Sequence, residues 1–357
     1  MREDHDVPLS TLTTMRVGGP AARLVTVTTT DELVDAVREV DDADEPLLVL
    51  SGGSNVVVPD AGFAGTVVHV TTSGIEPESA DYCGGAVVRV AAGEVWDDVV
   101  SRAVAEGWAG IEALSGIPGR TGATPIQNVG AYGQDVSQTI AQVRTWDRQE
   151  QAVRTFMNDD CGFTYRHSRF KGHSRYVVLD VQFQFEVGDL SRPIAYAALA
   201  TGLGVPLGTR VPLSDAREAV LDQRRARGMV LDDADPDTWS CGSFFTNPVL
   251  SRREFDDLVE RVGERFGWEG TTPPRFPEGD GHVKTSAAWL IEHAGFGKGF
   301  GLPAPAALST KHTLAVTNRG GASAADVLAL ARQVRDGVRD AFGVTLVNEP
   351  VLLGEQL

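Results

Sequence analysis

A short apolar run opens into a glycine turn in the stretch Leu48-Val49-Leu50-Ser51-Gly52-Gly53-Ser54-Asn55. Residues 46–50 predict a short buried strand, and the bare amides and hydroxyls of the turn could hold a pyrophosphate. Upstream, residues 23–28 are rich in strand formers, and Thr29-Thr30-Asp31-Glu32 is a capping box before apolar residues at helical spacing. These segments predict a β-α-β unit that ends in the turn. Taken alone, the turn could also be an ordinary tight turn without a ligand.

A second glycine-rich stretch, residues 115–133, reads SGIPGRTGATPIQNVGAYG. Its five glycines and two prolines exclude regular structure, yet Ile117, Ile126 and Val129 are too apolar for a surface linker. The stretch therefore predicts a rigid wrap whose backbone donors face something flat or phosphorylated. A packed omega-type loop is the alternative.

The rest of the chain predicts an α+β protein. Periodicity predicts strands at residues 86–92, 141–146, 176–186, 313–317 and 344–353. Helices are predicted at residues 95–106, 286–293 and 323–342, and from the capping box at Ser251 to Gly267. Boundaries near residue 72 and at 210–230 suggest three domains, which we place at 1–72, 73–225 and 226–343, with a terminal strand at 344–357 that could pack near the first.

Composition excludes several classes of protein. The 357 residues include 32 Lys and Arg against 49 Asp and Glu, so the formal net charge is −17. A nucleic-acid binder needs a basic surface, and we expect none here. The three cysteines form no paired motif, the seven histidines form no H-x-x-x-H pair, and no long apolar stretch occurs. We therefore expect a cytoplasmic protein with no metal, no membrane partner and small-molecule ligands, working as a monomer.

The common nucleotide-binding motifs are missing, since no G-x-G-x-x-G follows the first strand and no P-loop occurs. Three further segments carry candidate chemistry: Tyr165-Arg166-His167, Gly242-Ser243-Phe244-Phe245 with Asn247-Pro248, and Asn348-Glu349-Pro350. Each is weak alone, because an Arg is usually a surface ion pair and a Ser beside Gly is usually part of a turn. Ser243 has no G-x-S-x-G surroundings, so a hydrolase elbow is not indicated.

In this order, and with Thr14-Met15-Arg16-Val17-Gly18-Gly19-Pro20-Ala21, these segments resemble the UDP-N-acetylenolpyruvoylglucosamine reductases of peptidoglycan synthesis, in their longer subtype. The resemblance implies FAD and NADPH as cofactors and a vanillyl-alcohol-oxidase-type FAD-binding unit made by the first two domains. It also implies a third, α+β domain that binds the nucleotide sugar. Such an FAD unit accounts for the missing G-x-G-x-x-G.

The resemblance assigns roles to named residues. The implied FAD-binding residues are Leu50, Ser51, Gly52, Gly53, Ser54, Asn55, Ser115, Ile117, Pro118, Gly119, Gly122, Ala123, Gln127, Asn128, Gly130, Ala131, Tyr132 and Gly133. The implied substrate-binding residues are Tyr165, Tyr196, Arg227, Asn247 and His312. Arg227 stands where the family often has Lys, and the two cations are not interchangeable.

The resemblance also implies a mechanism in two half reactions. NADPH gives a hydride to flavin N5, and the reduced flavin then passes a hydride to C3 of the enolpyruvyl ether. Arg166, with Glu349 as its partner, would polarise the substrate carboxylate, and Ser243 would protonate C2. An oxidase of the same flavin fold and a flavin-free nucleotide-sugar binder are the alternatives. Cys241, beside Gly242, is expected to serve packing.

Overall fold

The computed structural model describes residues 1–81, 84–268 and 270–357 and divides them into two compact units. The first unit comprises Met1–Pro8, Pro20–Gly53 and Gly62–Val230, and the second comprises Leu9–Gly19, Ser54–Ala61 and Leu231–Leu357. The four boundaries inside the N-terminal region, after residues 8, 19, 53 and 61, therefore lie within the predicted domain 1–72. The division into 1–72, 73–225 and 226–343 stays a prediction.

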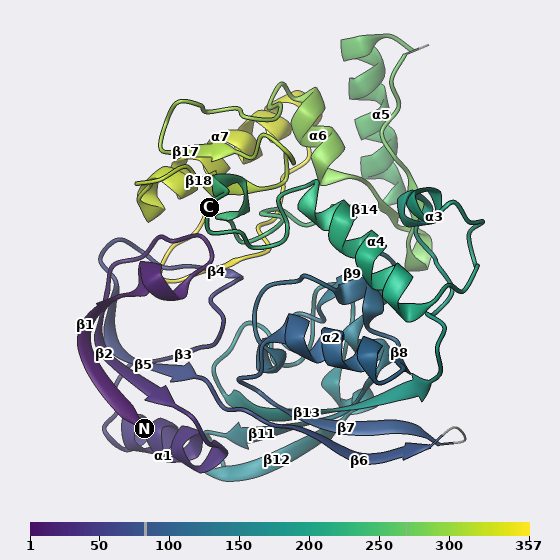
Figure 1. Ribbon diagram of the computed structural model, residues 1–357. Helices are drawn as coiled ribbons and strands as arrows, with labels where there is room; N and C mark the ends of the chain where they lie inside the picture. Colours follow the sequence, from purple (N-terminus) through teal and green to yellow (C-terminus); the bar gives the residue numbers. More distant parts are fainter. Residues whose placement is uncertain (82–83, 269) are drawn as a thin grey trace. The chain divides into compact units, whose positions relative to one another are not determined.

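The first unit begins with a four-stranded sheet in the order β1-β2-β5-β3 (Figure 1). Its strands are β1 (Arg2–Pro8), β2 (Pro20–Val27), β5 (Phe63–Val70) and β3 (Leu47–Leu50). β5 runs parallel to both β2 and β3, and helix α1 (Thr30–Asp42) makes the crossover between β2 and β3. The predicted β-α-β unit is confirmed, and Ser51 follows directly from its last strand.

Helix α1 forms where its sequence places a cap before an apolar stripe. The Thr29 hydroxyl accepts a hydrogen bond from the Glu32 amide at 3.2 Å, and the Glu32 carboxylate accepts one from the Thr28 amide at 2.8 Å. Leu33, Val37 and other apolar residues of the helix are buried. Each such side chain contributes about 1.5–3 kcal/mol when it leaves water.

A six-stranded antiparallel sheet forms the rest of the core of the first unit, in the order β12-β11-β13-β7-β6 with β8 paired to β13. Trp96 and Val100 of α2 pack in the same apolar core as Val88 and Phe183 of this sheet. The bounds are β6 (Ile75–Asp81), β7 (Gly85–Ala91), β8 (Trp108–Ala109), β11 (Ile140–Asp147), β12 (Ala152–Met157), β13 (Tyr176–Val187), α2 (Trp96–Ala105), α3 (Ala197–Leu203) and α4 (Leu213–Arg225).

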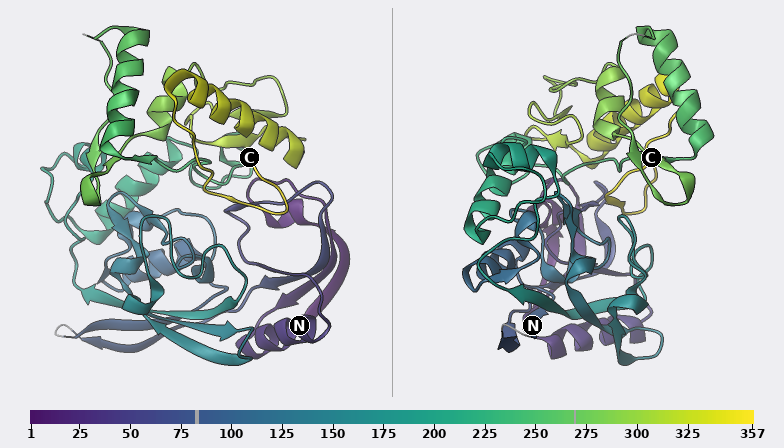
Figure 2. Two further views of the ribbon diagram at one scale, coloured as in Figure 1. Left: turned by 180° about the vertical axis from the view of Figure 1, so that it is seen from behind. Right: turned by 90° about the vertical axis from the view of Figure 1, so that its right-hand side faces the viewer.

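The second unit packs three helices over short strands. Its capping boxes at Ser251 and Ser323 are both formed, so α5 and α7 begin where the sequence predicts. The bounds are β4 (Val56–Val57), β14 (Val249–Leu250), α5 (Arg252–Phe266), β15 (Phe276–Pro277), β16 (Val283–Lys284), α6 (Ala287–His293), β17 (Ala306–Leu308), β18 (Val316–Asn318), α7 (Ala324–Phe342) and β19 (Val351–Leu352). Figure 2 shows α5, α6 and α7 from two further sides.

Two predicted strands of the second unit are shorter than expected. The strand expected at 313–317 is β18, Val316–Asn318, and of the one expected at 344–353 only β19 is a strand. β19 pairs in parallel with β4, joining Val351 to Val56. The segment before it is held to the chain by an isolated bridge between Phe245 and Asn348. Val344 and Leu346 of this segment are buried by packing without a ladder, which periodicity cannot distinguish from a strand.

Candidate functional site

The turn after β3 has features that suit an anionic ligand. The hydroxyl oxygen of Ser51 is buried and has no hydrogen-bond partner among the described residues. A Cβ on Gly52 would lie 2.6 Å from the Cα of Gly119, so only glycine allows this contact with the wrap at 115–133. Gly53 has a φ of +56°, in the left-handed region that glycine adopts readily. The two predicted glycine-rich segments therefore touch through their backbones at Ser51–Gly53.

The wrap at 115–133 contains a 3-10 turn, Thr121–Ala123, and the two-residue strand β9, Gly130–Ala131, so its regular structure is limited to short pieces. The Gly119 carbonyl accepts from the Trp96 amide at 3.1 Å, and the Gly122 amide donates to Ala92 at 2.8 Å. A Cβ on Gly122 would lie 2.6 Å from that of Ala92. These contacts fix the wrap against the start of α2 and the end of β7.

Two predicted FAD-binding side chains make hydrogen bonds inside the chain. The Ser115 hydroxyl donates to the Glu112 carbonyl at 2.6 Å. The buried Asn128 accepts from the Ser137 amide at 3.1 Å and donates to the Thr164 carbonyl at 3.2 Å. Asn128 also has a φ of +47°. Both residues shape the wrap, and a direct contact of either with FAD stays a prediction.

Arg166 is anchored on the same wrap. Its guanidinium donates to the Asn128 carbonyl at 3.4 Å and to the Gly130 carbonyl at 2.5 Å. Its own carbonyl accepts from Lys171 Nζ at 2.9 Å, and its φ is +53°. The guanidinium carbon also lies 5.3 Å from the centre of the exposed Tyr165 ring. The structure thus joins the predicted catalytic cation to the predicted flavin loop within one unit.

Two arginines, Arg224 and Arg227, act on the Tyr132 hydroxyl through their charge. Tyr132 and Tyr196 pack edge to face with ring centres 5.3 Å apart. Burial raises the pKa of Tyr132, and Arg224 and Arg227 oppose that rise, Arg227 partly through a hydrogen bond. The structure therefore brings together the predicted residues Tyr132, Tyr196 and Arg227.

Arg224 is the residue of this group to which the sequence assigned no contact. Its Nη2 donates to the Met229 carbonyl at 2.7 Å and to the Gly116 carbonyl at 3.3 Å, while its Nε is buried with no partner in the described part of the chain. Burial lowers the pKa of Arg224 to about 10. Arg224 lies three residues before Arg227 in the sequence, and this spacing is the sequence feature that could have indicated its part in the group.

In the second unit, backbone pairing joins the segment that carries Ser243 to the segment that carries Glu349. The Glu349 amide donates to the Phe244 carbonyl at 2.9 Å, and the Thr246 amide donates to Val347 at 3.0 Å. Phe244 and Phe245 are buried in the apolar core, which leaves Ser243 half-buried. The Ser243 loop is also tied to the N-terminal segment, because the Thr14 hydroxyl donates to the Ser240 carbonyl at 2.7 Å.

Asn55 lies in this unit as well, and its side-chain amide donates to the Glu349 carbonyl at 3.3 Å. Asn247, a predicted substrate contact, accepts from the Ala287 amide at 3.0 Å and so helps to begin α6. Its contact with substrate stays a prediction. Arg166 and Tyr196 belong to the first unit, and Ser243, Asn247 and Glu349 belong to the second.

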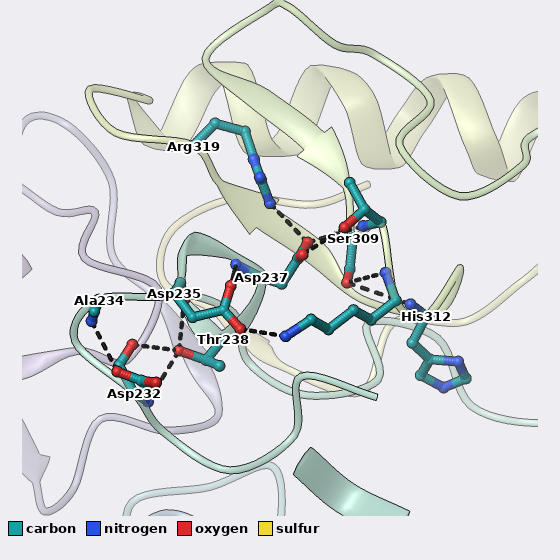
Figure 3. A network of polar contacts seen from close by, with 10 residues as sticks. Asp232, Ala234, Asp235, Asp237, Thr238, Ser309, His312 and Arg319 are labelled. Carbon is teal, nitrogen blue, oxygen red and sulfur yellow. Dashed lines mark hydrogen bonds and ion pairs between the residues drawn. The ribbon is translucent and has the colours of Figure 1, made fainter. Parts of the chain in front are cut away.

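His312 lies at the end of a polar network centred on Asp237 (Figure 3). The Asp237 carboxylate accepts from the Thr310 amide at 2.8 Å and from Arg319 at 2.7 Å. Burial raises the pKa of Asp237, but these partners hold it below its ordinary value. The Ser309 hydroxyl accepts from the His312 amide at 3.3 Å, which fixes the backbone that carries the predicted substrate contact.

Cys241 is buried, and its thiol donates to the Val56 carbonyl at 3.4 Å. Burial raises the pKa of Cys241 to about 12, so the thiol is a poor nucleophile at neutral pH. The packing role predicted for Cys241 fits this environment. Cys83, by contrast, lies outside the described residues.

Within residues 1–81, 84–268 and 270–357, no group of three or more His, Cys, Asp or Glu side chains could hold a metal ion. None of the helices that the structure describes is long and apolar enough to cross a membrane.

Comparison with protein families matches two parts of the chain. Residues 21–155 match the "FAD binding domain" family, and residues 235–353 match "UDP-N-acetylenolpyruvoylglucosamine reductase, C-terminal domain". The orphaned Ser51 hydroxyl and the Gly52–Gly119 contact, both inside the first match, fit a bound dinucleotide cofactor. The fold and this site therefore define an α+β, FAD-dependent oxidoreductase, as predicted.

Whole-length relatives define the family. The chain is 59% identical to a UDP-N-acetylenolpyruvoylglucosamine reductase of Thermobifida fusca over 353 residues, covering 99% of this chain and 98% of the relative. It is 56% identical to one of Streptomyces coelicolor, covering 100% and 92%. The crystal structure of a reductase of the same name from Thermus caldophilus superposes with a TM-score of 0.64 at 25% identity, over 99% of each chain. This chain belongs to the UDP-N-acetylenolpyruvoylglucosamine reductase family, which excludes the flavin-free alternative.

Proposed function

We propose that this chain reduces UDP-N-acetylglucosamine enolpyruvate to UDP-N-acetylmuramate, with NADPH as the reductant, to make a peptidoglycan precursor. The observation that carries the proposal is the backbone hydrogen bond between Phe244 and Glu349, which supports a site that uses both Ser243 and Glu349. The names of the relatives supply the substrate, and the FAD-binding match supplies the cofactor. We also propose a cytoplasmic monomer without nucleic-acid or membrane partners; the net charge of −17 supports the absence of nucleic acid.

Ser51–Gly53 and the wrap at 115–133 are the residues proposed to hold FAD. When bound there, FAD would supply the transfer of a hydride from NADPH to C3 of the enolpyruvyl ether. The close backbone contact of Gly52 with Gly119 leaves amides, and the Ser51 hydroxyl, to receive the pyrophosphate. Ser54 and Asn55, which follow Gly53 in the sequence, are also proposed to contact FAD.

Arg166 is proposed to stabilise negative charge on the substrate carboxylate. Hydride addition at C3 leaves a carbanion at C2 that is delocalised into this carboxylate, so a fixed cation lowers its energy. The two carbonyls that accept from Arg166 hold the guanidinium in one orientation before substrate binds. Glu349 is proposed to orient the same carboxylate together with Arg166.

Ser243 is proposed to donate its hydroxyl proton to C2. An alcohol is a weak acid in water, but a carbanion is basic enough to take its proton when the geometry is fixed. The hydrogen bond between Glu349 and Phe244 and the bond from Thr14 to Ser240 fix that loop on both sides of Ser243.

The test is an anaerobic measurement of the two half reactions of Ser243→Ala. NADPH should bleach the flavin absorbance at nearly the wild-type rate, whereas reoxidation by the enolpyruvyl sugar should slow by several orders of magnitude, on the order of 10²–10⁴-fold. The Ser243→Cys variant keeps a donor proton and should recover part of the rate.

Ser251→Ala is the matched control, because it removes a serine that caps α5 in the same unit. It should leave both half reactions unchanged. If Ser243→Ala slows both half reactions alike, Ser243 is structural and the proton-donor role is wrong. If reduced wild-type protein is not reoxidised by the enolpyruvyl sugar, the substrate assignment fails.

A further inference from the structure

His69 and Arg120 are two basic residues beside the Ser51 turn that have no role in the proposed reaction. His69 is in β5, opposite Leu50, the residue that precedes Ser51. Its ring is half-buried and donates a hydrogen bond to the Ser51 backbone. His69 therefore lies against the residue whose hydroxyl is buried and unpartnered in the described structure.

The backbone of Arg120, in the wrap at 115–133, lies close to the same turn. The Arg120 amide nitrogen lies 3.3 Å from the position that a Cβ on Gly52 would take. The Arg120 guanidinium donates to the Gly93 carbonyl, and the Gly93 amide donates to the Thr72 hydroxyl at 2.9 Å. Thr72 follows β5 by two residues, so a second, independent chain of contacts joins Arg120 to the end of the strand that carries His69.

The two described sheet neighbours of His69 carry no negative charge. Its neighbours on the sheet are Thr26 of β2 and Leu50 of β3, and neither titrates. Burial and then the charge of Arg120 lower the pKa of His69, while the hydrogen bond to Ser51 opposes them. Without a ligand, the site therefore holds one fixed cation and one neutral imidazole that can gain a proton.

We propose that His69 and Arg120 form a cationic support for the pyrophosphate of FAD behind the Ser51 turn, and that FAD binding is accompanied by proton uptake at His69. The pyrophosphate carries two negative charges, so its approach favours the imidazolium form. Arg120 supplies the permanent charge, and His69 supplies a charge that appears when the cofactor binds. The proposal rests on FAD binding and not on the identity of the sugar substrate.

The sign of the pH dependence follows from linkage. A ligand that raises the pKa of a group binds more tightly to the protonated protein. FAD affinity should therefore rise as the pH falls from about 8 to about 5.5, the range in which histidine titrates. Each unit by which FAD raises the pKa of His69 corresponds to about a tenfold gain in affinity.

The test is calorimetric titration of FAD into the full-length protein after its flavin has been removed. The heat is measured at several pH values in two buffers of different ionisation enthalpy, which gives the number of protons taken up. Wild-type protein should take up protons near neutral pH. His69→Gln should abolish this uptake and flatten the pH dependence of the dissociation constant. Arg120→Gln should weaken binding on the order of tenfold at all pH values.

Matched controls are available in the same unit. His5→Gln changes an exposed histidine of β1, and Arg102→Gln changes an exposed arginine that also donates to a backbone carbonyl. Neither should alter FAD affinity or proton uptake. Wild-type protein that binds FAD without proton uptake would overturn the proposal, and this result needs no variant to fold. Uptake that survives in His69→Gln would assign the proton to another group and overturn it equally.

Discussion

Arg166 has an unusual backbone conformation, and hydrogen bonds fix the orientation of its side chain. Its φ of +53° is uncommon for a residue with a Cβ, and such strain costs on the order of 1–3 kcal/mol. The hydrogen bonds to the Asn128 and Gly130 carbonyls and the bond from Lys171 to its own carbonyl hold it in place. The residue type could be predicted from the sequence, but its dependence on the wrap could not, because the two segments are joined only by the fold.

Arg166→Lys should slow the oxidative half reaction on the order of 10²-fold, because one ammonium cannot serve two carbonyls and a substrate carboxylate in the planar geometry of a guanidinium. Reduction of the flavin by NADPH should change little. Rapid-mixing absorbance of each half reaction measures both effects. Arg169→Lys is the control, since Arg169 is an exposed neighbour that stacks on Phe156. Equal rates in Arg166→Lys and wild type would remove Arg166 from the proposed mechanism.

The hydrogen-bond partners of two asparagines could not be predicted from the sequence. Asn128 and Asn247 were expected to contact ligands, yet their side chains bond to Ser137 and Thr164 and to Ala287. An asparagine amide serves a ligand or a backbone group with the same atoms. Which partner it meets depends on segments far away in the chain, and the sequence near it carries no sign of them.

Helices with side-chain caps were predictable as elements, while polar or exposed elements were not. α5 and α7 begin at the serines that the sequence marks. α4 has Pro212 at its N-cap position without a side-chain cap bond, and β1 is an exposed edge strand with five charged or titratable residues in its sequence REDHDVP. The buried apolar residues of α4, Leu213, Ala216, Val220 and Leu221, do lie at helical spacing, but no side-chain cap marks where the helix begins, and β1 shows no alternation of apolar residues.

Ser251→Ala should lower the free energy of unfolding by about 1 kcal/mol, because the hydroxyl that accepts from the Glu254 amide is lost. The loss also removes half of a reciprocal pair, since Glu254 accepts from the Ser251 amide at 2.7 Å. Urea unfolding followed by circular dichroism measures the change. Ser214→Ala, an exposed helical serine that bonds only to its neighbour Asp215 in the described contacts, should stay within about 0.5 kcal/mol of wild type. A cap variant as stable as this control would contradict the prediction.

At the scale of the whole molecule, the two units are interleaved in sequence. Leu9–Gly19 and Ser54–Ala61 belong with Leu231–Leu357, and Met15 and Val17 pack in the same core as Phe244 and Leu308. A composition shift or a linker marks a boundary only when the chain crosses it once. Here the chain crosses five times, so the sequence could predict many of the elements but not this partition.

The stability of the whole molecule in acid depends on buried carboxylates that are paired with cations. The Asp147 carboxylate is buried and accepts from Arg175 at 2.8 and 2.7 Å and from the Gln149 amide at 3.0 Å. The Arg175 hydrogen bond lowers the pKa of Asp147 in the folded protein, and Arg319 and Thr310 help to lower that of Asp237 despite its burial. A folded-state pKa below the unfolded value gives stability that is present above the unfolded value, about 3.9, and is lost as the pH falls through the folded one.

We therefore expect the midpoint of thermal unfolding to fall steeply below about pH 5, and Asp147→Asn to lower the midpoint at pH 7 while making the fall with acid shallower. The amide keeps the shape of the carboxylate but cannot hold the charge that Arg175 stabilises. Scanning calorimetry at several pH values measures both slopes. Asp159→Asn, a change at an exposed aspartate, should reproduce the wild-type slope. If Asp147→Asn loses stability in acid as steeply as wild type, the acid sensitivity arises from other carboxylates, and the Arg175 pair contributes nothing to it.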